Sequence, residues 1–169
     1  MKTAPPSKTN AARLLDSLGI PYELRPYQVD PDDLTAISVA RKIGLPPEQV
    51  FKTLLTHTNT GDHLFAVIPG DAELDLKKLA LAANAKKVEL ASLKEVEPLT
   101  GYIRGGVTVM GAKKPFPAYA DETIELFDII SVSAGQRGLQ IVLAPADYLR
   151  AANATIADLT KADLTKGAA

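Results

Sequence analysis

Two apolar runs on either side of a short polar segment constrain the fold of this chain more than any other feature. Residues 50–57 and 63–69 are rich in β-branched, aromatic and other apolar side chains, and the polar tetrapeptide Asn59-Thr60-Gly61-Asp62 lies between them. Two runs of this kind around a glycine-containing turn are typical of a β-hairpin. The sequence therefore predicts two paired strands in the middle of the chain.

Helix and strand signals alternate irregularly before and after this hairpin. Apolar spacing and capping residues predict helices over residues 11–18, 35–43, 76–83, 92–100 and around 148–149. Shorter apolar runs predict strands over residues 22–24, 88–90, 118–120, 129–133, 140–143 and 155–157. Hairpins mixed with crossovers favour an α+β domain with a mixed β-sheet over a doubly wound parallel sheet. We expect one compact domain over residues 1–169, frayed at 1–8 and 162–169.

The composition excludes several kinds of site. The chain has no Cys, which excludes disulfides, cysteine-ligated zinc, iron–sulfur clusters and a cysteine nucleophile. The two histidines, His57 and His63, lack the spacing of metal ligands on a helix, so we expect no metal. The glycines match neither a dinucleotide-binding motif nor a P-loop, no serine lies in a G-x-S-x-G elbow, and no cofactor is expected. Backbone donors, hydroxyl groups and one lysine remain as the material for a site.

The distribution of apolar and charged residues bears on location and partners. No apolar run approaches the ~20 residues of a membrane span, and residues 1–6 do not begin a signal peptide, so we expect a cytoplasmic protein without a membrane partner. The net charge of −1 argues against binding nucleic acid through bulk charge. Between Lys77 and Lys114, however, eight basic residues stand against three acidic ones. This segment is either a phosphate-facing patch or a set of solvated helix faces.

Three local features are candidates for chemistry. Lys52 alternates with Val50 and Leu54 on one strand face, where it is either an edge residue that reaches water or a cation held in a cleft. Residues 101–111 contain four glycines, which either form a tight bend or let backbone N–H groups approach a ligand. Residues 131–138 place serines, glycines and Arg137 at a strand end, as a hairpin turn or as an anion pocket.

Taken in order, these features resemble the YbaK/EbsC group of aminoacyl-tRNA deacylases, which are relatives of the editing domain inserted in bacterial prolyl-tRNA synthetase. The resemblance rests on residues 50–55, 74–78 with 85–89, 100–106 and 132–139, and spans the chain from about Ala11 to Leu159. It implies a mixed-sheet, barrel-like core flanked by helices. It also implies trans-editing of mischarged tRNA, most typically Cys-tRNA(Pro), with Cys-tRNA(Cys) as a second substrate. The implied partners are the acceptor end of tRNA and prolyl-tRNA synthetase.

The resemblance further implies roles for individual residues. The implied catalytic residues are Lys52, Gly105 and Ser133. The implied substrate-binding residues are Tyr27, Gly106, Thr108, Gly135 and Arg137. The basic segment supplies Lys77, Lys78, Lys86 and Lys87 as candidates for tRNA binding. In this scheme the thiol of the substrate attacks its own ester, so the protein needs no nucleophile.

Two alternatives remain beside this hypothesis. The chain departs from the family pattern at Thr108-Val109, Ala134 and Gln136, which bear on amino-acid specificity and on contacts with tRNA. One alternative is therefore a deacylase for Ala-tRNA(Pro) that uses a bound water. The other is a non-catalytic module that keeps the fold and binds a small ligand or a partner surface.

Overall fold

The predicted hairpin lies inside the larger of two β-sheets. The computed structural model describes residues 8–162, in which β2 (Phe51–Thr58) pairs antiparallel with β3 (His63–Pro69). Strand β4 (Val88–Leu90) is antiparallel to β2, whereas β5 (Ala118–Asp121) and β8 (Ala154–Ala157) extend the sheet in parallel. The order β4-β2-β3-β5-β8 therefore confirms the predicted mixed sheet.

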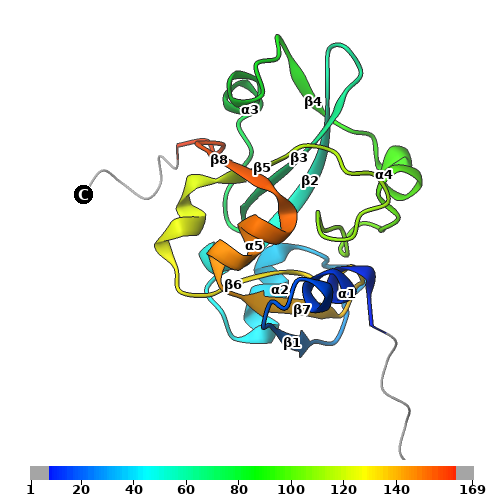
Figure 1. The fold of residues 1–169 in the computed structure, drawn as a ribbon, viewed down its shortest axis with the longest axis vertical. Coiled ribbons are helices and arrows are strands. Elements are labelled where there is room, and N and C mark those ends of the chain that lie inside the picture. Colours follow the sequence, from blue (N-terminus) through cyan, green and yellow to red (C-terminus); the bar gives the residue numbers. More distant parts are fainter. Residues whose placement is uncertain (1–7, 163–169) are drawn as a thin grey trace, which may run out of the picture.

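A second, antiparallel sheet consists of β1 (Glu23–Pro26), β7 (Leu139–Leu143) and β6 (Ile130–Ser133), in that order. Figure 1 shows it at the opposite end of the molecule from α3 and β4. An isolated bridge between Val50 and Ser131 connects the two sheets. The sequence located all of these strands but predicted one sheet, because an apolar run does not specify which other run it pairs with.

The helices begin where the capping residues predict. Side-chain oxygens of Thr9, Thr35 and Asp75 accept backbone N–H groups at the starts of α1 (Asn10–Ser17), α2 (Ala36–Ile43) and α3 (Leu76–Ala82). Helix α4 (Leu93–Thr100) begins at a capping box, in which the Glu95 carboxylate accepts the N–H of Ser92 at 2.8 Å. Helix α5 (Pro145–Ala152) begins with a proline. The two short 3-10 turns, η1 (Pro47–Gln49) and η2 (Glu122–Leu126), are additions to the predicted elements.

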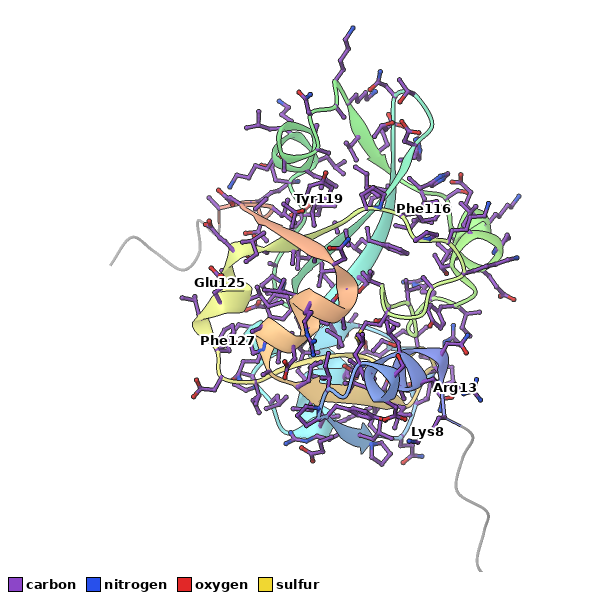
Figure 2. All side chains as sticks on the ribbon, viewed as in Figure 1. Lys8, Arg13, Phe116, Tyr119, Glu125 and Phe127 are labelled. Carbon is purple, nitrogen blue, oxygen red and sulfur yellow. The ribbon has the colours of Figure 1, made fainter. Side chains whose placement is uncertain are left out.

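One hydrophobic core is shared by both sheets. It contains side chains of β2, β3 and β5 from the larger sheet, of β6 and β7 from the smaller, and of α1 and α5. Tyr148 and Ile141 are fully buried in it. Figure 2 shows Glu125 and Phe127, at the η2 turn, on the side of the molecule away from α4. Of the predicted frayed ends, only Lys8 and Ala162 fall within the described residues. No helix of residues 8–162 is long and apolar enough to cross a membrane.

Candidate active site

A cavity of about 510 Å³ lies beside β2, at the edge opposite β3, where the first part of β2 has no strand on that side. Strand β4 pairs only with residues 56–58 of β2, and the smaller sheet meets the chain at the Val50 bridge. The edge between these two points faces the cavity instead of another strand. The other walls come from the start of α2, from residues 90–96, from the glycine-rich segment and from the β6 and β7 strands.

Lys52 is half-buried on β2 and lines this cavity. Its Nζ donates a hydrogen bond to the carbonyl of Gly70 at 3.2 Å. Burial lowers the pKa of Lys52 below 10.5, and the carboxylates of Asp71 and Glu73 oppose part of that shift. Because this stretch of β2 borders a cavity, the structure favours a cation held in a cleft over an edge residue that only reaches bulk water.

The glycine-rich segment brings Gly105 to the same cavity. Gly105 has a φ of +88°, a conformation that L side chains rarely adopt. The Nε of Arg137 donates to the carbonyl of Arg104 at 2.8 Å. Gly106 lies so close to the β6–β7 turn that a Cβ there would stand 2.9 Å from the Cα of Gln136. Gly106 and Arg137 are not among the lining residues, and they hold the segment that presents Gly105.

Ser133 reaches the cavity from the end of β6. Its Oγ accepts the N–H of Gly135 at 3.1 Å, which leaves its own hydroxyl hydrogen available to a ligand. Gly135 itself has a φ of +100°, and a Cβ there would lie 2.8 Å from the ring of Tyr102. Gly135 therefore shapes the turn and packs on Tyr102, whereas Ser133 faces the cavity.

Gln140 is a cavity residue that the sequence analysis did not select. It lies opposite Ser133 on β7 and is only 4% exposed. Its Oε1 accepts a hydrogen bond from the hydroxyl of Ser131 at 2.7 Å, so its NH2 group is left to donate. The signal in the sequence was a polar residue at the start of the apolar run 140–143.

None of the five predicted substrate-binding residues belongs to the cavity lining, and Tyr27 and Thr108 lie behind it. Tyr27 packs on the apolar face of α2, beside Val39 and Ile43, with the Nζ of Lys42 6.0 Å from its ring centroid. Thr108 is completely buried, and its hydroxyl has no hydrogen-bond partner within residues 8–162. The structure therefore places Tyr27 behind one wall of the cavity and Thr108 inside the protein, and their contacts with substrate stay predictions.

The four lysines predicted to bind tRNA lie on α3 and on the turn before β4, away from the cavity. The Nζ of Lys78 is 3.1 Å from a carboxylate oxygen of Asp158 and donates to the carbonyl of Thr160 at 2.7 Å. Lys87 pairs with Glu89 at 2.8 Å. Lys77 and Lys86 are exposed and have no such partner in the described part of the chain. These two lysines are therefore the freest of the four to contact phosphate.

The electrostatic character of the cavity follows from its lining. Lys52 and Arg104 are its charged side chains, and no Asp or Glu of residues 8–162 lines it. The polar groups of Ser133, Gln140 and Thr53 add hydrogen-bonding capacity, while most of the remaining lining is aliphatic. Such a cavity favours an anionic ligand that also carries a carbonyl or hydroxyl group.

Comparison with known proteins agrees with this geometry. The aminoacyl-tRNA editing domain matches residues 30–151, which is more than half of the chain. A protein of Enterococcus faecalis, named as a candidate Cys-tRNA(Pro)/Cys-tRNA(Cys) deacylase EbsC, is 46% identical over 153 residues, or 90% of this chain and 93% of that protein. The multifunctional Ser/Thr-tRNA deacylase ProXp-y of Escherichia coli is 34% identical over 91 residues, or 53% of this chain and 54% of that protein. A crystal structure described as a candidate trans-editing enzyme for prolyl tRNA synthetase has a TM-score of 0.79 at 25% identity, over 92% of this chain and 100% of that one. The chain therefore belongs to the aminoacyl-tRNA editing domain family.

Proposed function

We propose that this protein is a cytoplasmic enzyme that deacylates mischarged tRNA in trans, with Cys-tRNA(Pro) and Cys-tRNA(Cys) as its substrates. One observation carries the proposal. Lys52, Gly105 and Ser133 come from three separate segments of the chain, and all three line one cavity whose lining contains no acidic side chain. The names of the relatives from Enterococcus faecalis and Escherichia coli support the substrate class.

The chemistry suits a site without a nucleophile of its own. An aminoacyl ester is already activated, so positioning its carbonyl and stabilising developing negative charge supply much of the acceleration. The thiol of the cysteinyl group attacks its own carbonyl carbon, the bond to the ribose oxygen breaks, and the thiol proton passes to that oxygen. Free tRNA and a cyclic thioester leave, and water hydrolyses the thioester.

Different residues of the cavity hold different parts of the ester. The ammonium of Lys52 steadies the ester and the terminal ribose from the buried end of the cavity. The backbone at Gly105 and the hydroxyl of Ser133 orient the carbonyl. Gly106, Gly135 and Arg137 act by holding these groups in place, and Tyr27 supports the wall that α2 forms.

The experiment that tests the proposal is single-turnover deacylation of a panel of charged tRNAs. The panel holds Cys-tRNA(Pro), Cys-tRNA(Cys) and Ala-tRNA(Pro), with Pro-tRNA(Pro) as the correctly charged control. Ser- and Thr-charged tRNAs are included because one relative is named for them. We expect rapid release of cysteine, no release of proline, and a loss of about 100-fold in Lys52→Ala, the size seen when one stabilising charge or donor is removed.

Three outcomes would contradict parts of the proposal. Equal rates for the wild type and a folded Lys52→Ala protein would remove Lys52 from the mechanism. Release of alanine in preference to cysteine would favour a bound water as the attacking group. No release from any member of the panel would favour the non-catalytic module. Repeating the panel with prolyl-tRNA synthetase present tests whether the synthetase delivers the substrate.

A further inference from the structure

We propose that the mouth of the cavity binds the terminal nucleotide of the tRNA, with Arg104 on its phosphate and Leu90 and Leu93 against its base. This inference rests on the proposed function, because it assigns part of the same substrate to a surface for which no role has yet been given. Three observations support it: the position of Arg104, the charge of the lining and the exposure of the two leucines.

Arg104 is held at the cavity by its backbone while its side chain stays free. Its carbonyl accepts the hydrogen bond from the Nε of Arg137 at 2.8 Å, and the N–H of Gly106 donates to the carbonyl of Ile103 at 2.8 Å. Both bonds fix the segment on which Arg104 stands. The guanidinium of Arg104 is exposed and has no carboxylate or carbonyl partner within residues 8–162. An arginine side chain without a protein partner, on a backbone that is held in place, suits a phosphate, which a guanidinium can bind through two parallel hydrogen bonds.

The two cations of the lining differ in exposure, which puts the proposed phosphate site at the mouth of the cavity. Lys52 is half-buried and bonded to Gly70, whereas Arg104 is exposed, so Arg104 is the cation of the lining that a ligand in solution reaches more readily. With two cations and no acidic side chain in the lining, the cavity attracts a ligand that carries negative charge at its outer end. An aminoacylated nucleotide has this form, since its ester and ribose precede its phosphate.

Leu90 and Leu93 form an aliphatic part of the same lining that faces solvent. They are 54% and 61% exposed, although both contribute to the cavity. The acceptor end of tRNA is single-stranded, and its unpaired bases need an apolar or aromatic surface to stack on. Beside an unpaired arginine, two exposed leucines match a nucleotide better than they match an apolar peptide segment.

The test measures binding of two probes, adenosine and adenosine 5′-monophosphate, by NMR titration, and deacylation of Cys-tRNA(Pro) in parallel. Arg104→Gln is expected to weaken binding of the monophosphate about tenfold, as for a lost charge-assisted hydrogen bond, and to leave adenosine binding unchanged. Leu93→Ser is expected to weaken both probes. Arg13→Gln is the control for charge, since Arg13 lies on α1 outside the cavity (Figure 2). Leu81→Ser is the control for exposed leucine, because Leu81 on α3 is 83% exposed and also lies outside the cavity.

The outcomes separate this inference from the proposed function. If the wild type releases cysteine while Arg104→Gln binds the monophosphate as tightly as Arg13→Gln does, the subsite is wrong and the function stands. If the wild type releases nothing from any charged tRNA, the function fails, whatever the probes do. If the Arg104 and Leu93 variants lose activity only in the presence of prolyl-tRNA synthetase, this surface binds a protein and the nucleotide subsite is wrong.

Discussion

At the scale of single residues, Lys52 shows that the site works against the stability of the fold. A lysine in an unfolded chain keeps its ordinary pKa of 10.5, but burial lowers the pKa of Lys52 in the folded protein. Between the lowered value and 10.5 the unfolded state binds more protons, so stability rises with pH in this window. Below the lowered pKa the whole destabilisation is present.

This linkage predicts that Lys52→Met makes the protein more stable at pH 7 while it slows deacylation about 100-fold, as Lys52→Ala does, since an apolar side chain of similar length removes the half-buried charge. Urea unfolding of the wild type and the variant at pH 7 and at pH 10 measures the effect. The advantage of the variant should shrink at pH 10, where more of the wild-type Lys52 is neutral. A variant that is less stable at both values would mean that the bond to Gly70 outweighs the cost of burial.

Three of the residues that line the cavity were selected from the sequence because a residue type was out of place there. Lys52 is a charged residue in an apolar strand, and Ser133 is a hydroxyl residue at a strand end. Residues 101–111 contain an unusual number of glycines. Gln140 was also out of place in an apolar run, but a single polar side chain in a strand more often hydrogen-bonds to a neighbouring residue than to a ligand. The orientation of the Gln140 amide depends on its hydrogen bond with Ser131 on the neighbouring strand. Which strands pair cannot be deduced from either residue alone.

At the scale of elements, the β6–β7 turn and the glycine-rich segment act as one unit. The turn supplies Ser133 and, through Arg137, holds the carbonyl of Arg104, while Gly135 packs on the ring of Tyr102. The hydroxyl of Tyr102 in turn donates to the carbonyl of Met110 at 2.8 Å, within the glycine-rich segment. A change at this contact should therefore move Ser133 and Gly105 relative to each other.

We predict that Gly135→Ala slows deacylation about 100-fold, the size expected for a displacement of about 1 Å in a catalytic group. Gly61→Ala is the matched control. Gly61 also has a positive φ, of +86°, but lies at the tip of the β2–β3 hairpin, where a Cβ would meet nothing within 4 Å. Both variants should lose about 1 kcal/mol of stability from the strained backbone, and Gly135→Ala more because of the ring of Tyr102. Equal deacylation by the two variants would show that the contact with Tyr102 does not position the site.

An element could be predicted where its sequence signal lies within a few residues, and not where it depends on contacts between distant segments. Caps such as Asp75 and the pair Ser92 and Glu95 are local, so the starts of these helices followed from the sequence. The division into two sheets depends on contacts between distant segments, such as the bridge from Val50 to Ser131, which carry no local signature. The path of residues 102–106 is set in the same way by the β6–β7 turn against which it packs, whereas Gly111 packs on the start of α1.

At the scale of the whole molecule, two separate groups of basic residues are candidates for contact with the tRNA. One group, Lys52 and Arg104, lines the cavity. The other lies on α3 and before β4, at the end of the molecule away from the three-stranded sheet (Figure 1). Because the net charge of the chain is only −1, neither group is reinforced by a general positive field, and any contact with the body of the tRNA must come from local pairs.

Within the second group, we predict that two pairs of lysines differ in their contribution to the salt dependence of tRNA binding. Each phosphate contact contributes about 0.7–0.9 to the slope of log K against log salt concentration. Because the side chains of Lys77 and Lys86 are exposed and make no ion pair within residues 8–162, the double variant Lys77→Gln/Lys86→Gln should lower the magnitude of this slope by one contact or more. The double variant Lys78→Gln/Lys87→Gln removes the same charge, but Lys78 and Lys87 are engaged with Asp158 and Glu89, so the slope should change less.

Binding of uncharged tRNA(Pro) at several salt concentrations measures both slopes, and a thermal melt of each variant confirms that it is folded. Equal changes in the two variants would mean that the lysines act through total charge and not through contacts. An unchanged slope in both would make the lysines solvated helix faces. In that case the acceptor end alone holds the substrate at the cavity, and a weak wild-type affinity would have to be offset by delivery from a synthetase, because one nucleotide subsite provides few phosphate contacts.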